Sequence, residues 1–216
     1  ATETCAVKAL ALFERHDDPA GRAHALFEAG HAASWTGTVS PGGKPLDMRR
    51  FRAALELARE MHDPVLEARV HLAMAASVGY GSGDYEEGIA HYRAVESSRD
   101  AMADPSIGPL LYADRAWFLL RTTRDLTAAE RDLSESERRA KKVHDAAALG
   151  AVKYLSAIAV GDKGRYSEAA RLDEDAGTAL VRAGLMGYAA DAYFCAVGFH
   201  LAAGDWVGYR RVSSVL

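Results

Sequence analysis

Apolar residues recur along most of this chain at intervals of three and four positions. The stretch with Phe51, Ala54, Leu55, Ala58 and Met61 shows the pattern clearly. This spacing places apolar side chains on one face of an α-helix, whereas a half-buried strand would alternate apolar and polar residues. No stretch sustains such an alternation, and the prolines fall at boundaries between apolar stretches. The pattern therefore predicts an all-α protein.

Two short signals recur at a nearly constant interval and divide the helical pattern into repeated units. Asp63-Pro64 recurs as Asp104-Pro105, and the same interval again leads to Asp145. An Asp side chain caps the free N–H groups of a first helical turn, and Pro fits into that turn. A second signal recurs at nearly the same interval, as Gly83-Asp84-Tyr85, Arg124-Asp125-Leu126, Gly164-Arg165-Tyr166 and Gly204-Asp205-Trp206. Both signals predict helix starts.

The signals predict eleven helices, which are 2–16 followed by the pairs 19–35 with 46–62, 64–80 with 84–102, 105–122 with 126–143, 146–162 with 165–183, and 186–203 with 205–215. Capping-box patterns join Asp84 to Glu87 and Thr127 to Glu130. One pair cannot bury its apolar face alone, so the pairs must stack, and we expect a single repeat domain over residues 1–216. The first helix matches the second helix of a pair, so we expect the chain to be a module of a larger protein.

The segment Gly83 to Val95 (GDYEEGIAHYRAV) is similar to the turn and second helix of a tetratricopeptide repeat. Gly88 and Val95 stand at small positions of that family and Tyr92 at its aromatic position, whereas Asp173 stands where an aromatic is expected. The small residue of the first helix recurs as Gly30, Ala75, Ala116 and Ala157, with Val197 in the last unit. The resemblance implies a right-handed α-solenoid of about five helix-turn-helix repeats plus one N-terminal helix.

A period of about 41 residues, rather than the roughly 34 of the common repeat, resembles one subset of this family. This subset is found in large bacterial signal-transduction ATPases and transcription regulators. Its arrays sense a ligand or partner protein, while another domain provides the output. The resemblance therefore implies a recognition module whose concave groove binds a peptide, a partner segment or a small effector.

The composition argues against nucleic acid and membranes as partners. Of 216 residues, 49% are hydrophobic and 26% are charged, and the net charge is −4 with the basic residues spread out, so no basic surface favours phosphate backbones or anionic lipids. No apolar run reaches the roughly 18 residues of a spanning helix. Two cysteines, Cys5 and Cys195, indicate reduced thiols in a cytoplasmic protein.

No motif predicts catalysis, a metal or a cofactor. His24 and His31 share a helix face but lack the spacing of a zinc site. The loop Gly37 to Pro45 differs from a phosphate-binding loop because its lysine comes one position late, a proline replaces the Ser or Thr, and a helix precedes it. The acidic groups are predicted to be exposed helix residues, namely Glu86-Glu87, Asp173-Glu174-Asp175, Glu135 and Glu137. We therefore expect no enzyme activity.

The resemblance places the inward face of the groove on the first helix of each pair, at positions counted from its small residue. These positions hold many aromatic and charged side chains, namely His24, Phe27, His31, Trp35, Arg69, Leu72, Tyr80, Trp117, Arg121, Tyr154, Ile158, Asp162, Asp191 and Phe194. Aromatic and Arg side chains commonly anchor binding sites. We expect binding by His24, His31, Trp35, Arg69, Tyr80, Trp117, Arg121 and Tyr154. The alternative is that Trp35, Trp117 and Tyr154 form inter-helix core.

In the leading hypothesis, apolar ligand groups pack against Trp117, Tyr154 and Tyr80, while Arg69 and Arg121 pair with a carboxylate. A second hypothesis is a scaffold that docks a partner, or forms a homo-oligomer, through apolar faces at the ends of the array. A third is an enzyme on a helical-repeat fold, because the fold alone does not decide function. Buried, converging carboxylates or histidines would favour the third.

Overall fold

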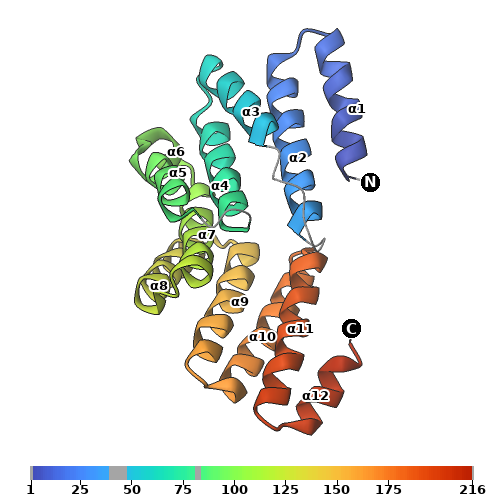
Figure 1. The fold of residues 1–216 in the computed structure, drawn as a ribbon, viewed down its shortest axis with the longest axis vertical. Helices are drawn as coiled ribbons and strands as arrows, with labels where there is room; N and C mark the ends of the chain where they lie inside the picture. The colour runs from blue at the N-terminus through green and yellow to red at the C-terminus, as the bar shows by residue number, and fades with distance from the viewer. Residues whose placement is uncertain (1, 39–47, 81–83, 216) are drawn as a thin grey trace. The chain divides into compact units, whose positions relative to one another are not determined.

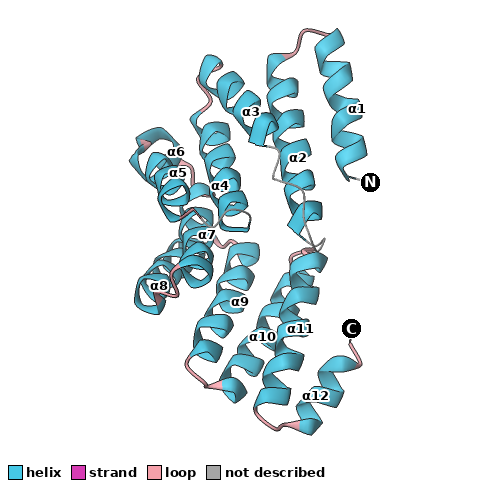
Figure 2. Ribbon diagram, in the orientation of Figure 1, coloured by secondary structure: helices cyan, strands magenta, loops and turns pink. Residues whose placement is uncertain are grey.

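The computed structural model describes residues 2–38, 48–80 and 84–215, with the backbone alone for residues 2–3, 33–38 and 80. These residues form helices and turns, with no β-strand among them (Figure 2). The helices are α1 (Thr2–Arg15), α2 (Pro19–Thr38), α3 (Met48–Glu60), α4 (Pro64–Tyr80), α5 (Tyr85–Ser97), α6 (Arg99–Ala103), α7 (Ile107–Thr122), α8 (Leu126–Val143), α9 (Ala146–Asp162), α10 (Tyr166–Arg182), α11 (Met186–Ala202) and α12 (Trp206–Ser213). The all-α prediction is confirmed for this part of the chain.

One predicted helix, 84–102, is divided into α5 and α6 at Ser98. Ser98 has extended backbone angles (φ −80°, ψ 102°), so it ends α5, and its hydroxyl accepts the N–H of Ala101 to start α6. Serine competes with helix in this way because its side chain bonds to nearby backbone. The next helix begins at Ile107 rather than residue 105, since Asp104 holds the N–H of Ser106 at 2.8 Å in a turn.

The Asp residues of both sequence signals cap helices as predicted. Their carboxylates accept backbone N–H groups two or three residues on, in Asp18, Asp63, Asp84, Asp125, Asp145 and Asp205. In α8 the cap is Asp125, bonded to Ala128 at 3.0 Å, so the capping box predicted for Thr127 is wrong. Arg165 holds the cap position of α10 without a side-chain bond. A helix therefore starts at the repeat signal even where no side chain caps it.

The chain divides into two compact units, 1–107 and 108–216. In each unit, consecutive helices pack side by side, as the order of colours in Figure 1 shows, and α7 contacts α8 through the Arg115–Asp132 ion pair and a shared apolar cluster. First helices of neighbouring pairs also touch, α2 with α4 in the first unit and α9 with α11 in the second. Adjacent helix pairing is thus confirmed within each unit, while the single domain over 1–216 stays a prediction.

Small residues allow the helices to approach closely. Ala75, Ala116 and Ala157 are fully buried at the predicted small positions, and Val197 is half-buried. A Cβ on Gly30 would lie 2.9 Å from the Phe51 ring, inside the distance that real Cβ contacts allow. Apolar clusters then fill each unit: Phe51, Leu55, Leu66 and Val70 in the first, and Leu119, Leu133, Val152 and Leu155 in the second.

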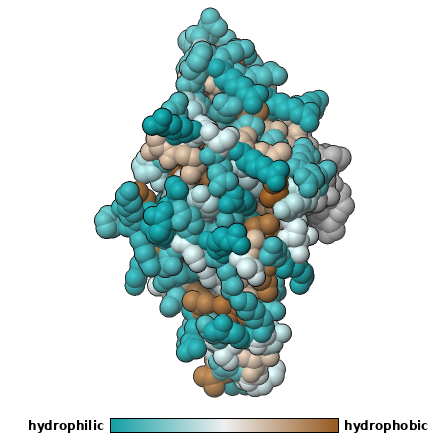
Figure 3. Space-filling model, turned by 90° about the vertical axis from the view of Figure 1, so that its left-hand side faces the viewer, coloured by the Kyte–Doolittle hydropathy of each residue, from teal (hydrophilic) through white to brown (hydrophobic). Residues whose placement is uncertain are grey.

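The surface is largely polar in the view of Figure 3, where apolar atoms form small separate patches. Among the described residues, no helix combines the length and the apolar character needed to cross a bilayer. Cys5 and Cys195 are both free thiols.

Arg165→Asp is expected to raise the unfolding free energy by about 0.5–1 kcal/mol. The new carboxylate would cap α10 as Asp125 caps α8, while the exposed Arg165–Glu168 ion pair that it removes contributes little. Urea denaturation followed by circular dichroism measures the change. The matched control Asp125→Ala should lose about 1 kcal/mol, and no gain in Arg165→Asp would contradict the capping argument.

Candidate functional site

The predicted binding residues of the first unit lie on α2 and α4. His24, His31 and Arg69 are exposed, and the His31 ring stacks on Phe27 with centroids 5.9 Å apart. The Arg69 guanidinium lies 3.5 Å from the Ser106 hydroxyl. The side chains of Trp35 and Tyr80 lie outside the described residues. The loop predicted from Gly37 to Pro45 is helical at its start, because α2 continues to Thr38, and the rest of that loop lies outside the described residues. Among the described side chains, no contact joins His24, His31 and Arg69 in a shared site within the first unit.

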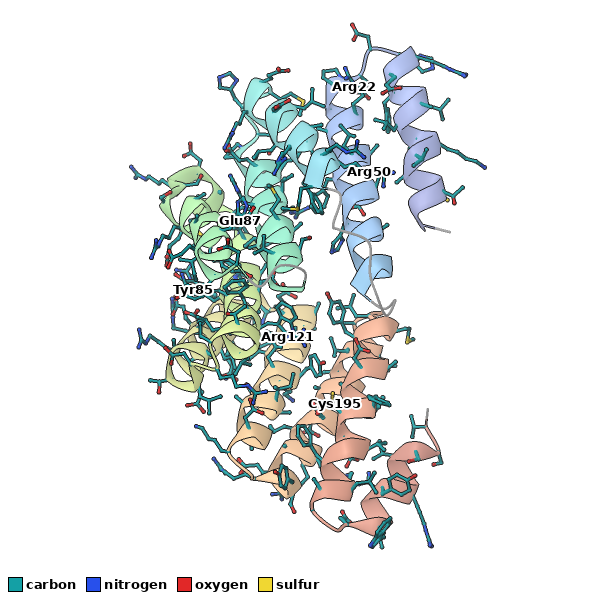
Figure 4. All side chains as sticks on the ribbon, in the orientation of Figure 1. Arg22, Arg50, Tyr85, Glu87, Arg121 and Cys195 are labelled. Carbon is teal, nitrogen blue, oxygen red and sulfur yellow. The ribbon has the colours of Figure 1, made fainter. Side chains whose placement is uncertain are left out.

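The predicted residues of the second unit do lie together in part. Trp117 on α7, and Tyr154 and Ile158 on α9, all pack against one apolar cluster while remaining half-buried. The Arg121 guanidinium, on the last turn of α7 (Figure 4), lies 5.6 Å from the centre of the Trp117 ring. This distance is that of a cation–π contact. The two alternatives for Trp117 and Tyr154, core and surface, therefore both hold in part.

Asp173 on α10 is the most unusual residue of this unit. It has no exposed surface, and neither carboxylate oxygen has a hydrogen-bond partner among the described residues. Burial raises the pKa of Asp173 to about 8, because a charged carboxylate loses its hydration there. The prediction that Asp173 is an exposed helix residue is wrong. Glu174 is half-buried as well, since it pairs with His200.

The register of the repeat explains where Asp173 lies. It stands eight residues after the cap position Arg165, as Tyr92 follows Asp84 and Leu133 follows Asp125. Tyr92 and Leu133 are both buried core residues. The same position in α10 is therefore a core position that holds an acid. Its departure from the aromatic pattern was the signal in the sequence that could have identified the site.

Two side chains from neighbouring helices face Asp173. The Tyr154 hydroxyl on α9 donates to the Cys195 thiol on α11, and both groups interact electrostatically with Asp173 and with Asp191, also on α11. Burial, with the two carboxylates, raises the pKa of Cys195 and of Tyr154, and burial also raises that of Asp191. Figure 4 shows Cys195 where α9, α10 and α11 meet. We name Tyr154, Asp173, Asp191 and Cys195 the acidic cluster.

A histidine pair forms a second buried polar group, in the first unit. The Nδ1 atoms of His71 on α4 and His91 on α5 lie 2.9 Å apart, so one must carry a proton and the other must accept it. Burial, and then the neighbouring His91, lowers the pKa of His71 to about 4, although the Glu67 carboxylate opposes this shift. Burial also lowers the pKa of His91, and the Glu87 carboxylate opposes that shift. Arg59 bonds Glu67 at 2.8 Å. The two rings therefore satisfy each other through their Nδ1 atoms, which links α4 to α5.

A third group joins the last helices. The Nε2 of buried His200 lies 2.8 Å from Glu174, and its Nδ1 lies 2.8 Å from Asp205 without the angle of a hydrogen bond. Arg211 on α12 also bonds Glu174, at 2.8 Å. These contacts link α10, α11 and α12, which indicates a structural role. Within the described ranges, no three His, Cys, Asp or Glu side chains are placed to hold a metal ion.

Asp173→Asn is expected to remove a fall in stability with rising pH. The folded-state pKa, about 8, lies above the unfolded value of 3.8, so the wild-type stability from this group is complete below pH 3.8 and is lost as pH rises through 8. The wild type should lose about 3 kcal/mol more than Asp173→Asn across this window. Urea denaturation at several pH values measures this, with exposed Asp175→Asn as control. Parallel curves for wild type and Asp173→Asn would refute the assignment.

His71→Gln is expected to reduce the acid sensitivity of the first unit. The folded pKa of His71, about 4, lies below the unfolded value of 6.5, so the stability of the neutral form is complete above pH 6.5 and falls as pH drops towards 4. The wild type should lose about 2 kcal/mol more than the variant over this range. Thermal unfolding from pH 7 to 4 tests it. Exposed His24→Gln should behave like the wild type, and an equal effect of both changes would contradict the prediction.

The chain matches no protein-family model, and a search of curated proteins returns no match. A function for this chain must therefore be inferred from its own residues and their geometry.

Proposed function

We propose that this chain is a recognition module that binds a peptide, a partner segment or a small effector and performs no catalysis itself. In this proposal its helix pairs form a right-handed, tetratricopeptide-like α-solenoid, and the first helix of each pair presents the concave surface. The regular interval between helix-start signals, the adjacent helix packing and the buried small residues support this arrangement. A module of this type acts in a cytoplasmic bacterial regulator by coupling ligand binding to an output domain.

The observation that carries the proposal is the exposure of Phe194. This aromatic side chain is 72% exposed on α11, at a position expected to face inward. Burying such a side chain against a ligand contributes about 1.5–3 kcal/mol. Half-buried Trp117 and Tyr154, on α7 and α9, offer further aromatic surface at inward positions of the two preceding pairs. Three successive first helices of the second unit therefore present aromatic residues to a ligand.

The polar groups beside these aromatic residues would orient the ligand. Arg121, held over the Trp117 ring, supplies a cation suited to a ligand carboxylate. Asp191 is exposed on the same helix as Phe194. Apolar surface with a few well-placed polar groups is the usual composition of a ligand site. In the first unit, considered by itself, Arg69 and His31 are exposed at the predicted positions.

Phe194→Ala is expected to weaken ligand binding at least about tenfold, or about 1.4 kcal/mol. The ligand is whatever native mass spectrometry finds retained on the purified protein or, failing that, a peptide selected against it from a random library. Isothermal titration calorimetry gives Kd for both proteins.

The matched control is Val181→Ala, which removes an exposed apolar side chain from α10, the second helix of a pair. It should leave Kd within about twofold of the wild type. The proposal fails if Val181→Ala and Phe194→Ala weaken binding equally, or if neither does.

A further inference from the structure

The acidic cluster contains two carboxylates that nothing in its surroundings neutralises. Asp173 is fully buried with both oxygens unbonded, and Asp191 makes no hydrogen bond or ion pair among the described residues. The groups that face them are the Tyr154 hydroxyl from α9 and the Cys195 thiol from α11. None of these groups can carry a positive charge.

An unpaired carboxylate in a protein core is unfavourable by several kcal/mol, so proteins normally pair it or replace it with an apolar residue. This chain does both elsewhere. Asp132 accepts two bonds from Arg115, at 2.7 and 2.9 Å, and Tyr92 and Leu133 fill the positions that correspond to Asp173. Because neither solution is used at Asp173, its carboxyl group stays protonated unless a cation from outside the described residues pairs with it.

We infer that the acidic cluster is a binding site for a primary alkylammonium group, as carried by a lysine side chain or a small polyamine. An ammonium group has three N–H donors and is compact. The cluster offers acceptors for it, which are the carboxylate oxygens of Asp173 and Asp191 and the hydroxyl oxygen of Tyr154. A planar guanidinium is larger than an ammonium group, so it fits less readily beside the fully buried carboxylate of Asp173. This inference rests on the proposed recognition function and names the chemistry of its ligand.

The position of the cluster fits a ligand that reaches in from the aromatic surface. Asp191 is exposed and Tyr154 and Cys195 are half-buried, so three of the four members of the cluster reach the surface. Asp191 and exposed Phe194 stand three residues apart on α11, and so on one face of that helix. The alkyl part of a lysine or polyamine would pack on the aromatic surface while its ammonium group meets the carboxylates.

Binding of the cation is coupled to loss of a proton. Asp173 holds a proton at pH 6, because burial raises its pKa to about 8. An ammonium group favours the charged carboxylate, so the proton must leave as the ligand enters. Affinity should therefore rise with pH between 6 and 8.5, while the ammonium group itself stays protonated. A neutral ligand would show no such dependence.

The test is isothermal titration calorimetry of the full chain with two probes, N-acetyl-lysine-N-methylamide and putrescine, at pH 6 and 8.5. The matched neutral probe is N-acetyl-norleucine-N-methylamide, which keeps the alkyl chain and lacks the amine. At least one charged probe should bind about tenfold or more tightly at pH 8.5 than at pH 6. Titrations in buffers of different ionisation enthalpy should show release of a proton. The stronger probe identifies a peptide lysine or a free polyamine as the source.

Asp173→Asn should weaken the charged probe at least about tenfold at pH 8.5 and remove the pH dependence. Asp191→Asn, on the exposed side of the cluster, should also weaken it, which keeps the test valid if Asp173→Asn alters folding. Asp175→Asn, exposed on the same helix as Asp173, should bind like the wild type. The inference is overturned if neither charged probe binds, if the norleucine probe binds equally well, or if Asp173→Asn and Asp191→Asn leave Kd unchanged.

The outcomes also separate this inference from the proposed function. A retained ligand that loses affinity in Phe194→Ala, but lacks an ammonium group and is unaffected by Asp173→Asn, supports recognition and overturns the ammonium site. A lysine probe that depends on Asp173, together with a retained ligand indifferent to Phe194→Ala, supports the ammonium site and overturns the proposed aromatic surface.

Discussion

Close approach of neighbouring helices, at one small residue in every first helix except α11, is the constraint on which the packing of both units depends. Ala75, Ala116 and Ala157 are fully buried there, and Gly30 leaves no room for a Cβ beside Phe51. Protein interiors are packed as densely as organic crystals, so a fixed helix spacing also fixes which neighbouring positions are filled. The register that makes Tyr92 and Leu133 core residues is therefore the register that buries Asp173.

Three buried polar groups differ in how they are satisfied. His71 and His91 share a proton between their Nδ1 atoms, with Arg59, Glu67 and Glu87 nearby. His200 lies between two carboxylates and links three helices. These two groups stabilise the helix packing from within. Asp173 has no such partner among the described residues, although its position requires one. A buried polar group without a partner, in a fold where the other two such groups are paired, marks a place where function is expected.

The acidic cluster also changes the chemistry expected of the ligand. The sequence drew attention to Arg69 and Arg121 and so to a ligand carboxylate, whereas the cluster calls for a cation. The two are compatible in the second unit if the ligand carries both charges, with Arg121 near Trp117 and the carboxylates on α10 and α11. The aromatic residues contribute burial in either case. The polar groups decide which ligand fits, because mismatched charges are costly once water is excluded.

Local chemistry determined most of what the sequence could predict. The Asp caps, their regular spacing and the apolar periodicity depend on residues within one or two helical turns, so they indicated the helices and their pairing. The break at Ser98 was not predicted, because it depends on a single hydrogen bond of the Ser98 hydroxyl. Only tertiary structure decided that Asp173 is buried, that Tyr154 is hydrogen-bonded to Cys195, and that the His71 ring contacts the His91 ring. These facts depend on side chains from different helices, and burial, which shifts their pKa values, exists only after those helices have packed.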